Sequence, residues 1–260
     1  MSIFKKFVIS VYSEVLFWYN IFLETYKKAI SEKKSFLSLS NYLFFEKIYF
    51  NILKNNDYLI VDVGANDGWF AKSILHFDDE ADIISYEPLK SQVENLKKLK
   101  NYKNFDFKSV ALGMSVDRLE LKEYNTTSLS SLLNLKDGQY KKIGFSTNIK
   151  EKYDVCVTTL DKELVGVKKK IFLKIDVQGF EMEVLRGAAS LFDSNKIDVV
   201  LIELVNREKY AGQTLAVEII NFLNKYNFVI FDLHPFYYED DNGQLSEFDA
   251  LFVNKNYNLV

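Results

Sequence analysis

One apolar run, which ends in an acid and a glycine-bearing turn, constrains this chain more than any other stretch. Residues 58–63 read YLIVDV, and residues 64–70 continue as GANDGWF. A continuous apolar run predicts a strand that is buried on both faces of a parallel sheet. Glycines 64 and 68 permit positive φ and close approach of a ligand, and the helix that follows points its free N–H groups toward the turn. The stretch is therefore typical of a nucleotide-type site in an α/β domain.

The glycine pattern of this turn separates the nucleotide ligands. A dinucleotide fingerprint needs glycines where Asn66 and Trp69 stand, and a P-loop needs a Gly-Lys-Ser/Thr ending that the turn lacks. Asp62, at the strand end, would repel a pyrophosphate but suits a cationic ligand. S-adenosylmethionine (SAM) carries a sulfonium and an ammonium and no phosphate, so the pattern favours SAM. An ordinary strand-to-helix turn is the alternative.

A second acid, Glu87, ends the next apolar run and falls 25 residues after Asp62 (87 − 62). This is near the separation at which an acid of the second strand meets ribose hydroxyls. The exit of the third strand, at Val110 and Ala111, is where this fold class usually holds adenine, with an ordinary strand exit as the alternative. The predicted cofactor-binding residues are Asp62, Gly64, Asn66, Gly68, Glu87, Val110 and Ala111.

The rest of the chain alternates strand-like and helix-like segments. Strands are predicted over 58–63, 82–87, 105–110, 171–176, 199–202 and 228–233, and helices over 69–77, 89–100, 181–191 and 215–226. This alternation predicts an α/β fold with a doubly wound, mostly parallel sheet. A last strand over 249–253 is expected to lie antiparallel beside 228–233, because the polar stretch between them suits a hairpin.

A helical extension (1–56) is predicted to precede the SAM-binding domain (57–260). Residues 7–23 are largely apolar, but they include Glu14, and their polar residues recur along one stripe of a helix. We therefore expect an amphipathic helix that packs on its own domain or on a partner subunit and does not span a membrane. Interfacial membrane contact by this helix is the alternative. A second helical segment is expected over 39–53.

Composition bounds the partners and the compartment. The chain has 260 residues and a net charge of −3, so it has no basic surplus with which to bind a nucleic-acid polymer. Its single cysteine, Cys156, excludes an intramolecular disulfide and fits a cytoplasmic location. The oligomeric state is left open, with a homo-oligomer among the alternatives.

Transfer of a methyl group from a sulfonium is an in-line displacement, in which the enzyme must orient the acceptor oxygen and remove its proton. Asp176 and Glu203 stand at strand ends and are expected to converge with Asp62 on one edge of the sheet. Asp176 is predicted to contact the acceptor or act as the base, with Glu203 and His234 as alternatives. Asp176 and Glu203 could also bind a divalent ion, although the prediction is that no metal is required.

Three motifs resemble those of the FkbM-family methyltransferases. They are VDVGANDG at 61–68, YEP at 86–88, and KIDVQGFE at 174–181 followed by VLRGA at 184–188. The resemblance runs from about residue 58 to residue 254. It implies a class I, Rossmann-like SAM-dependent fold and O-methylation, often of sugars or polyketide-type products, and does not fix the acceptor. Many members carry Glu where Gln178 stands. The family also has a Ser-Ser-Leu element comparable to the hydroxyl-rich segment 126–133.

The predicted function is therefore that of a SAM-dependent O-methyltransferase acting on a hydroxyl of a small molecule or glycan. One alternative is a non-catalytic partner subunit that keeps the fold, which the intact Asp62, Gly64, Glu87 and Asp176 disfavour. A nicotinamide-dependent oxidoreductase is a further alternative, which the missing glycines disfavour.

Overall fold

The computed structural model describes residues 43–136, 145–239 and 242–256. The chain divides into two compact units, Met1–Asn51 and Ile52–Val260, and the predicted domain boundary at 56/57 stays a prediction. The amphipathic helix predicted over 7–23 lies outside the described residues. Residues 43–48 are α-helical, and a π-helix, η1 (Tyr49–Leu53), follows them along the chain. None of the helices in the described ranges has the length and apolar character that a membrane span requires.

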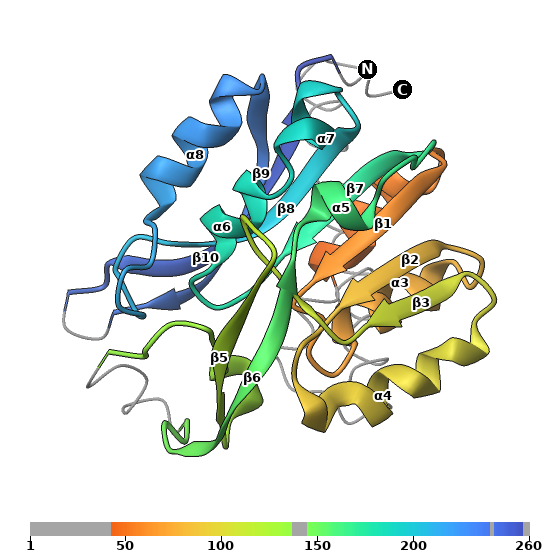
Figure 1. Ribbon diagram of the computed structural model, residues 1–260. Helices are drawn as coiled ribbons and strands as arrows, with labels where there is room; N and C mark the ends of the chain where they lie inside the picture. The colour runs from red at the N-terminus through yellow and green to blue at the C-terminus, as the bar shows by residue number, and fades with distance from the viewer. Residues whose placement is uncertain (1–42, 137–144, 240–241, 257–260) are drawn as a thin grey trace, which may run out of the picture. The chain divides into compact units, whose positions relative to one another are not determined.

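A seven-stranded sheet forms the centre of the second unit, in the order β3-β2-β1-β7-β8-β10-β9 (Figure 1). The strands are β1 (Tyr58–Val63), β2 (Asp82–Tyr86), β3 (Phe105–Lys108), β7 (Lys170–Ile175), β8 (Ile197–Val205), β9 (Phe228–Tyr238) and β10 (Leu245–Asn254). The pairs among β3, β2, β1, β7 and β8 are parallel, whereas β10 lies antiparallel to both β8 and β9. The predicted α/β fold, with a mostly parallel sheet and an antiparallel last strand, is confirmed.

Helices cover both faces of this sheet, which is why its central strands are apolar throughout. The helices are α3 (Trp69–Phe77), α4 (Val93–Lys97), α5 (Leu160–Glu163), α6 (Glu181–Arg186), α7 (Ala189–Asp193) and α8 (Ala216–Lys225). In the sheet, β2 lies on one side of β1, whereas β7 and then β8 lie on the other. Right-handed crossovers from β1 to β2 and from β7 to β8 therefore place α3 and α6 on opposite faces. In Figure 1, α5, α6 and α7 face the viewer and α3 lies behind the sheet.

The single helix predicted over 181–191 is two helices, α6 and α7, separated at Gly187. A Cβ atom at Gly187 would lie 2.0 Å from the carbonyl oxygen of Gly113, so only glycine fits where these two segments meet. Asp161 then caps α7, because its carboxylate accepts hydrogen bonds from the N–H groups of Ser190 (2.9 Å) and Leu191 (3.0 Å). Gly187 thus allows the close approach of Gly113, and Asp161 fixes the start of α7.

Strands β8 and β9 continue beyond their predicted ends. Glu203 lies inside β8, and His234 lies inside β9 rather than in the loop expected after it. Both positions are held by β10, whose Asp249 pairs with Glu203 on one side and with His234 on the other. The following Pro235 is tolerated because β9 is the edge strand of the sheet.

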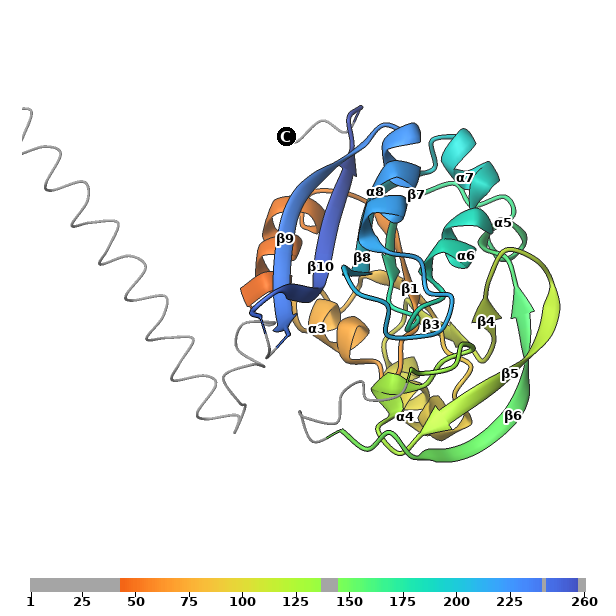
Figure 2. The ribbon, with the colours of Figure 1, turned by 90° about the vertical axis from the view of Figure 1, so that its left-hand side faces the viewer.

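A smaller sheet of three strands, in the order β4-β6-β5, is inserted along the chain between β3 and β7 (Figure 2). It contains β4 (Ala111–Leu112), β5 (Asp117–Tyr124) and β6 (Ile149–Thr158), and the 3-10 helix η4 (Thr127–Leu129) follows β5. Its apolar side chains form a core of their own, in which Leu121 and Val157 pack with Leu89 of the main domain. This contact brings the small sheet to the side of the segment that follows β2.

Candidate active site

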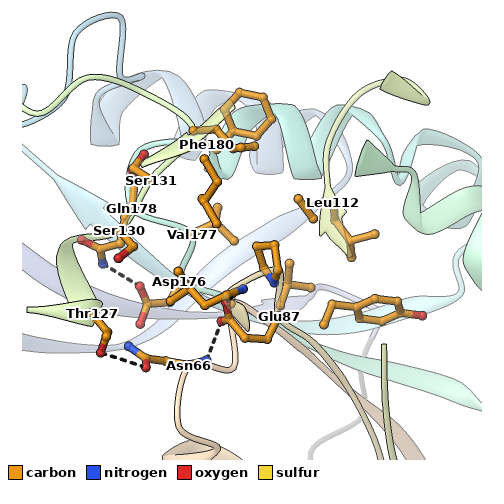
Figure 3. A pocket seen from close by; sticks show the side chains of 18 of the residues that line it. Asn66, Glu87, Leu112, Thr127, Ser130, Ser131, Asp176, Val177, Gln178 and Phe180 are labelled. Atoms are coloured by element: carbon orange, nitrogen blue, oxygen red, sulfur yellow. Dashed lines mark hydrogen bonds between the residues drawn. The ribbon is translucent and has the colours of Figure 1, made fainter. Parts of the chain in front are cut away.

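A pocket opens at the carboxyl ends of β1, β2 and β7 (Figure 3). The order of the strands reverses between β1 and β7, and such a switch point is where ligands bind in doubly wound sheets. The turns after these three strands form the floor and sides of the pocket, and the small sheet with η4 closes it from the other side. The site is therefore assembled from segments that are far apart in the sequence.

The turn after β1 is held by its own backbone. The N–H groups of Gly64 and Ala65 donate hydrogen bonds to the carbonyl oxygen of Tyr86, at 2.9 and 3.2 Å. Gly64 has φ of +77°, and a Cβ atom there would lie 1.8 Å from the carbonyl oxygen of Asp176. Only glycine satisfies both conditions, because it tolerates positive φ and has no side chain. The turns after β1 and β7 therefore touch at this point.

Glu87 joins the turn after β1 to the segment after β2. Its carboxylate accepts hydrogen bonds from the backbone N–H groups of Asn66 and Leu89, each at 2.7 Å. Burial raises the pKa of Glu87 from 4.5 to about 7, although these two N–H groups act in the opposite direction. Without a ligand, the folded protein therefore keeps a proton here that the unfolded chain releases. The contribution of Glu87 to stability falls as the pH rises from about 4.5 to about 7.

A buried lysine lies beneath the pocket. Lys174 Nζ is 3.0 Å from Asp62 Oδ1 and 4.0 Å from Asp176 Oδ2, and it donates a hydrogen bond to the carbonyl oxygen of Gly64 at 2.8 Å. Burial lowers the pKa of Lys174, but the charges of Asp62 and Asp176 outweigh this, so the pKa lies above its ordinary value. Lys174 thus connects the acid of β1, the glycine turn and the acid that follows β7.

Two of the predicted cofactor residues do not line the pocket. Asp62 is 0% exposed, and its second carboxylate oxygen accepts a hydrogen bond from the hydroxyl of Ser85 at 3.2 Å. It therefore supports the turn from below. Gly68 ends the turn: it has φ of +81°, its N–H donates to the carbonyl oxygen of Ala65, and the side chains of Leu96 and Leu99 pack against it. The predicted residues that line the pocket are Gly64, Asn66, Glu87, Val110 and Ala111.

The segment after β7 places three polar side chains together. Asp176 lines the pocket with its side chain 41% exposed. The amide nitrogen of Gln178 donates a hydrogen bond to Asp176 Oδ1 at 2.8 Å (Figure 3) and another to Glu203 Oε2 at 2.9 Å. Burial, followed by the charge of Asp176, raises the pKa of Glu203 well above its ordinary value. The sheet edge therefore brings Asp176 and Glu203 together, as expected, with the amide of Gln178 between them.

Hydroxyl groups form the rim of the pocket opposite these acids. Thr127, Ser128, Ser130 and Ser131 all line it. The hydroxyl of Thr127 donates a hydrogen bond to Asn66 Oδ1 at 3.3 Å, which ties the rim to the turn after β1. The hydroxyl-rich segment 126–133 therefore supplies this rim.

Glu203 and His234 do not line the pocket. Glu203 lies behind Gln178, whereas His234 is on the edge strand β9, separated from β8 by β10. Among the described residues, no group of three His, Cys, Asp or Glu side chains is arranged to hold a metal ion. Of the three predicted catalytic residues, the structure brings only Asp176 to the cavity.

Lys174 and Gln178 were not predicted as site residues. Lys174 had a signal, since a charged side chain within the apolar run IFLKI must find a partner once the strand is buried. Gln178 had none in the residues themselves, because an amide after a strand end is common in turns.

The seven-stranded topology, with a pocket at the switch point, defines the chain as a class I methyltransferase fold. The chain belongs to the FkbM methyltransferase family: the methyltransferase FkbM domain matches residues 62–230, which is most of the chain. This family implies SAM as the methyl donor.

Several solved structures resemble the chain. A methyltransferase FkbM from Methylobacillus flagellatus KT has 14% identity and a TM-score of 0.49, and the match covers 78% of this chain and 47% of that one. The chain thus spans about half the length of that protein. A magnesium protoporphyrin IX methyltransferase from Synechocystis PCC 6803, solved with bound SAM, has 10% identity, coverage of 84% and 82%, and a TM-score of 0.45. A putative RNA methyltransferase from Pyrococcus horikoshii has 13% identity, 83% coverage of both chains and a TM-score of 0.41. A search of curated proteins gives no match.

Proposed function

We propose that the protein is a SAM-dependent O-methyltransferase that methylates a hydroxyl of a small molecule or glycan. The observation that carries this proposal is the pocket itself. One cavity joins the carboxylate of Glu87, an apolar surface, the partly exposed Asp176 and a rim of hydroxyl groups. The first two features fit an adenosyl group, and the last two fit a polar acceptor. The acceptor class is supported by these lining residues and by the family.

The residues present fit SAM. Glu87 uses its two oxygens to hold backbone N–H groups, and a carboxylate has further lone pairs with which to accept ribose hydroxyls. Val110, Ala111 and Leu112 offer an apolar surface to a flat base. When bound, SAM supplies an activated methyl group. The residues of the protein must orient the acceptor hydroxyl and accept its proton. We assign Asp176 as the proton acceptor.

Glu87→Gln should weaken SAM binding about 10–100-fold, because an amide nitrogen would then face the N–H group of Asn66 or Leu89 and leave a buried donor without an acceptor.

SAM affinity of the unmodified protein should fall about tenfold between pH 8 and pH 6, since the charged form of Glu87 accepts the hydroxyls and its pKa is about 7. Calorimetric titration across this pH range measures both effects.

The matched control is Glu94→Gln, which removes a carboxylate whose side chain is 77% exposed on α4 and should leave SAM binding unchanged. A pH dependence of SAM affinity that persists in Glu87→Gln would show that another group controls binding.

Asp176→Asn should lower methyl transfer about 10²–10⁴-fold while SAM affinity stays within about threefold, because only the proton acceptor is lost. The assay is transfer of a labelled methyl group from SAM to a panel of polyhydroxyl, amine and carbon acceptors, with a mass gain of one methylene identifying the acceptors that react. The control variant is Asp154→Asn, which changes a 61% exposed carboxylate on β6. Transfer only to amine or carbon acceptors, or full activity in Asp176→Asn, would contradict the proposal.

A further inference from the structure

Both the nitrogen and the oxygen of the Gln178 side-chain amide have polar partners. Its nitrogen donates to Asp176 Oδ1 and Glu203 Oε2, and its oxygen lies 3.0 Å from the hydroxyl of Tyr210. An amide nitrogen offers two hydrogens and no acceptor, so no proton lies between it and the two carboxylate oxygens that face it. The reverse orientation of the amide would place its oxygen against both carboxylates. The partners therefore determine which way the amide points.

The backbone around Gln178 holds this side chain in place. Gln178 has φ of +54°, a conformation that non-glycine residues rarely adopt, and Gly179 follows with φ of +103°. The carbonyl oxygen of Gln178 accepts a hydrogen bond from the hydroxyl of Ser131 at 2.6 Å. Tyr210, 1% exposed, also lies 3.0 Å from the carbonyl oxygen of Leu129. An uncommon conformation fixed by several contacts is typical of a functional position.

Several further acids surround the two carboxylates. The titratable groups that act on the pair are Lys174 from β7, Glu181 from α6, Tyr210 from the segment after β8, and Glu247 and Asp249 from β10. Two cations offset these charges: Lys174, which is shared with Asp62, and Lys209, which lies 3.4 Å from Glu247 Oε1 and also pairs with Glu239. Two carboxylates in such an environment would ordinarily share a proton. The neutral amide lies between them and donates to both, so no proton has to bridge the two facing oxygens.

We propose that Gln178 is a positioning residue for methyl transfer: its amide holds Asp176 and Glu203 together without a shared proton and keeps Asp176 directed into the pocket. The role of Asp176 as base rests on the proposed function above, whereas the state of the carboxylate pair does not. A carboxylate at position 178 would place three acids within hydrogen-bonding distance, so at least one of them would have to be protonated.

The test is thermal unfolding of the unmodified protein and of Gln178→Glu, measured from pH 5 to pH 8 without any ligand. The folded variant binds its extra proton more tightly than the unfolded chain does, so it loses stability as the pH rises. We expect the melting temperature of Gln178→Glu, relative to the unmodified protein, to fall by about 5 °C more at pH 8 than at pH 5.

Gln92→Glu is the matched control. Gln92 is another buried glutamine, 7% exposed, whose Oε1 accepts a hydrogen bond from Asn95 Nδ2 at 2.9 Å. The control measures what burial of a new carboxylate does by itself. A pH-dependent loss at position 178 that is no larger than the loss at position 92 would overturn the proposal.

A swap variant, Asp176→Asn with Gln178→Glu, exchanges the amide and the acid and restores one amide to the cluster. It should recover most of the stability that Gln178→Glu loses at pH 8, including the case in which the single variant does not fold. A swap variant no more stable than the single variant would also overturn the proposal. Because unfolding needs neither SAM nor an acceptor, these results are independent of whether methyl transfer is found.

The catalytic readout follows once an acceptor is known. In Gln178→Glu, the acidic limb of the pH–rate profile should move to higher pH by about one unit or more, while SAM affinity stays within about threefold. A loss of rate with an unmoved profile would indicate a merely structural role and would contradict the proposal.

Discussion

Replacing Lys174 by methionine should lower the free energy of unfolding by about 3–5 kcal/mol, because it leaves a buried carboxylate without its counter-ion. Asp62 is fully buried, and Lys174 lies 3.0 Å from it. The same substitution removes the hydrogen bond to the carbonyl oxygen of Gly64, so the cofactor turn loses a support. Urea unfolding followed by circular dichroism measures the loss.

Lys97→Met is the control for Lys174→Met. Lys97 pairs with Glu94 on the surface of α4, where its side chain is 56% exposed, and the loss of such a pair should cost at most about 1 kcal/mol. The double variant Asp62→Asn with Lys174→Met removes both buried charges and should recover part of the loss. If Lys174→Met were as stable as the control, the ion pair would not hold the site together.

Gly64→Ala should destabilise the protein by about 2–5 kcal/mol, because a methyl group is forced into an occupied space at a positive φ. The new Cβ atom would lie 1.8 Å from the carbonyl oxygen of Asp176, which is backbone and cannot rotate away. The turns after β1 and β7 would have to separate, and SAM affinity should fall with the distortion of the pocket. Urea unfolding and calorimetry measure the two effects.

Gly166→Ala isolates the steric part of this effect. Gly166 has φ of +76°, almost the same as Gly64, but no heavy atom lies within 4 Å of the Cβ position. Gly166→Ala should therefore lower the free energy of unfolding by only about 1–2 kcal/mol, the penalty of the left-handed backbone. Equal losses in the two variants would show that the contact between the two turns is unimportant.

The sequence predicted the residues whose role depends on being at a strand end. Gly64, Glu87 and Asp176 follow parallel strands, and the carboxyl ends of such strands meet at one edge of the sheet. An acid or a glycine that directly follows an apolar run can therefore be assigned to this pocket from the sequence. The antiparallel last strand could also be predicted, because the polar stretch before it indicates a hairpin.

The position of Asp62 depends on a partner that its own segment does not reveal. A strand-end acid can point into the pocket or away from it, and the choice here is made by pairing with Lys174, which stands opposite Asp62 in the register of β1 and β7. That pairing joins residues far apart in the sequence. A lysine in an apolar run indicates that an acid must lie near, but not which acid.

The environments of His234 and Gln178 likewise depend on segments that are distant in the sequence. Pro235 suggests that a strand has ended, whereas the edge position of β9 allows the strand to continue past His234. The amide of Gln178 meets Glu203 and Tyr210 only because β8 and the segment after it pack beside β7. Neither the edge position nor the packing can be read from a local pattern.

Calorimetric titration of the purified protein with SAM, S-adenosylhomocysteine and NAD shows whether the pocket binds SAM. We predict that the first two bind, that NAD does not, and that Glu87→Gln weakens both binding reactions. A folded protein that binds none of the three would contradict the assignment of the pocket and favour a non-catalytic partner subunit. Binding of NAD alone would contradict it in favour of a nicotinamide-dependent oxidoreductase.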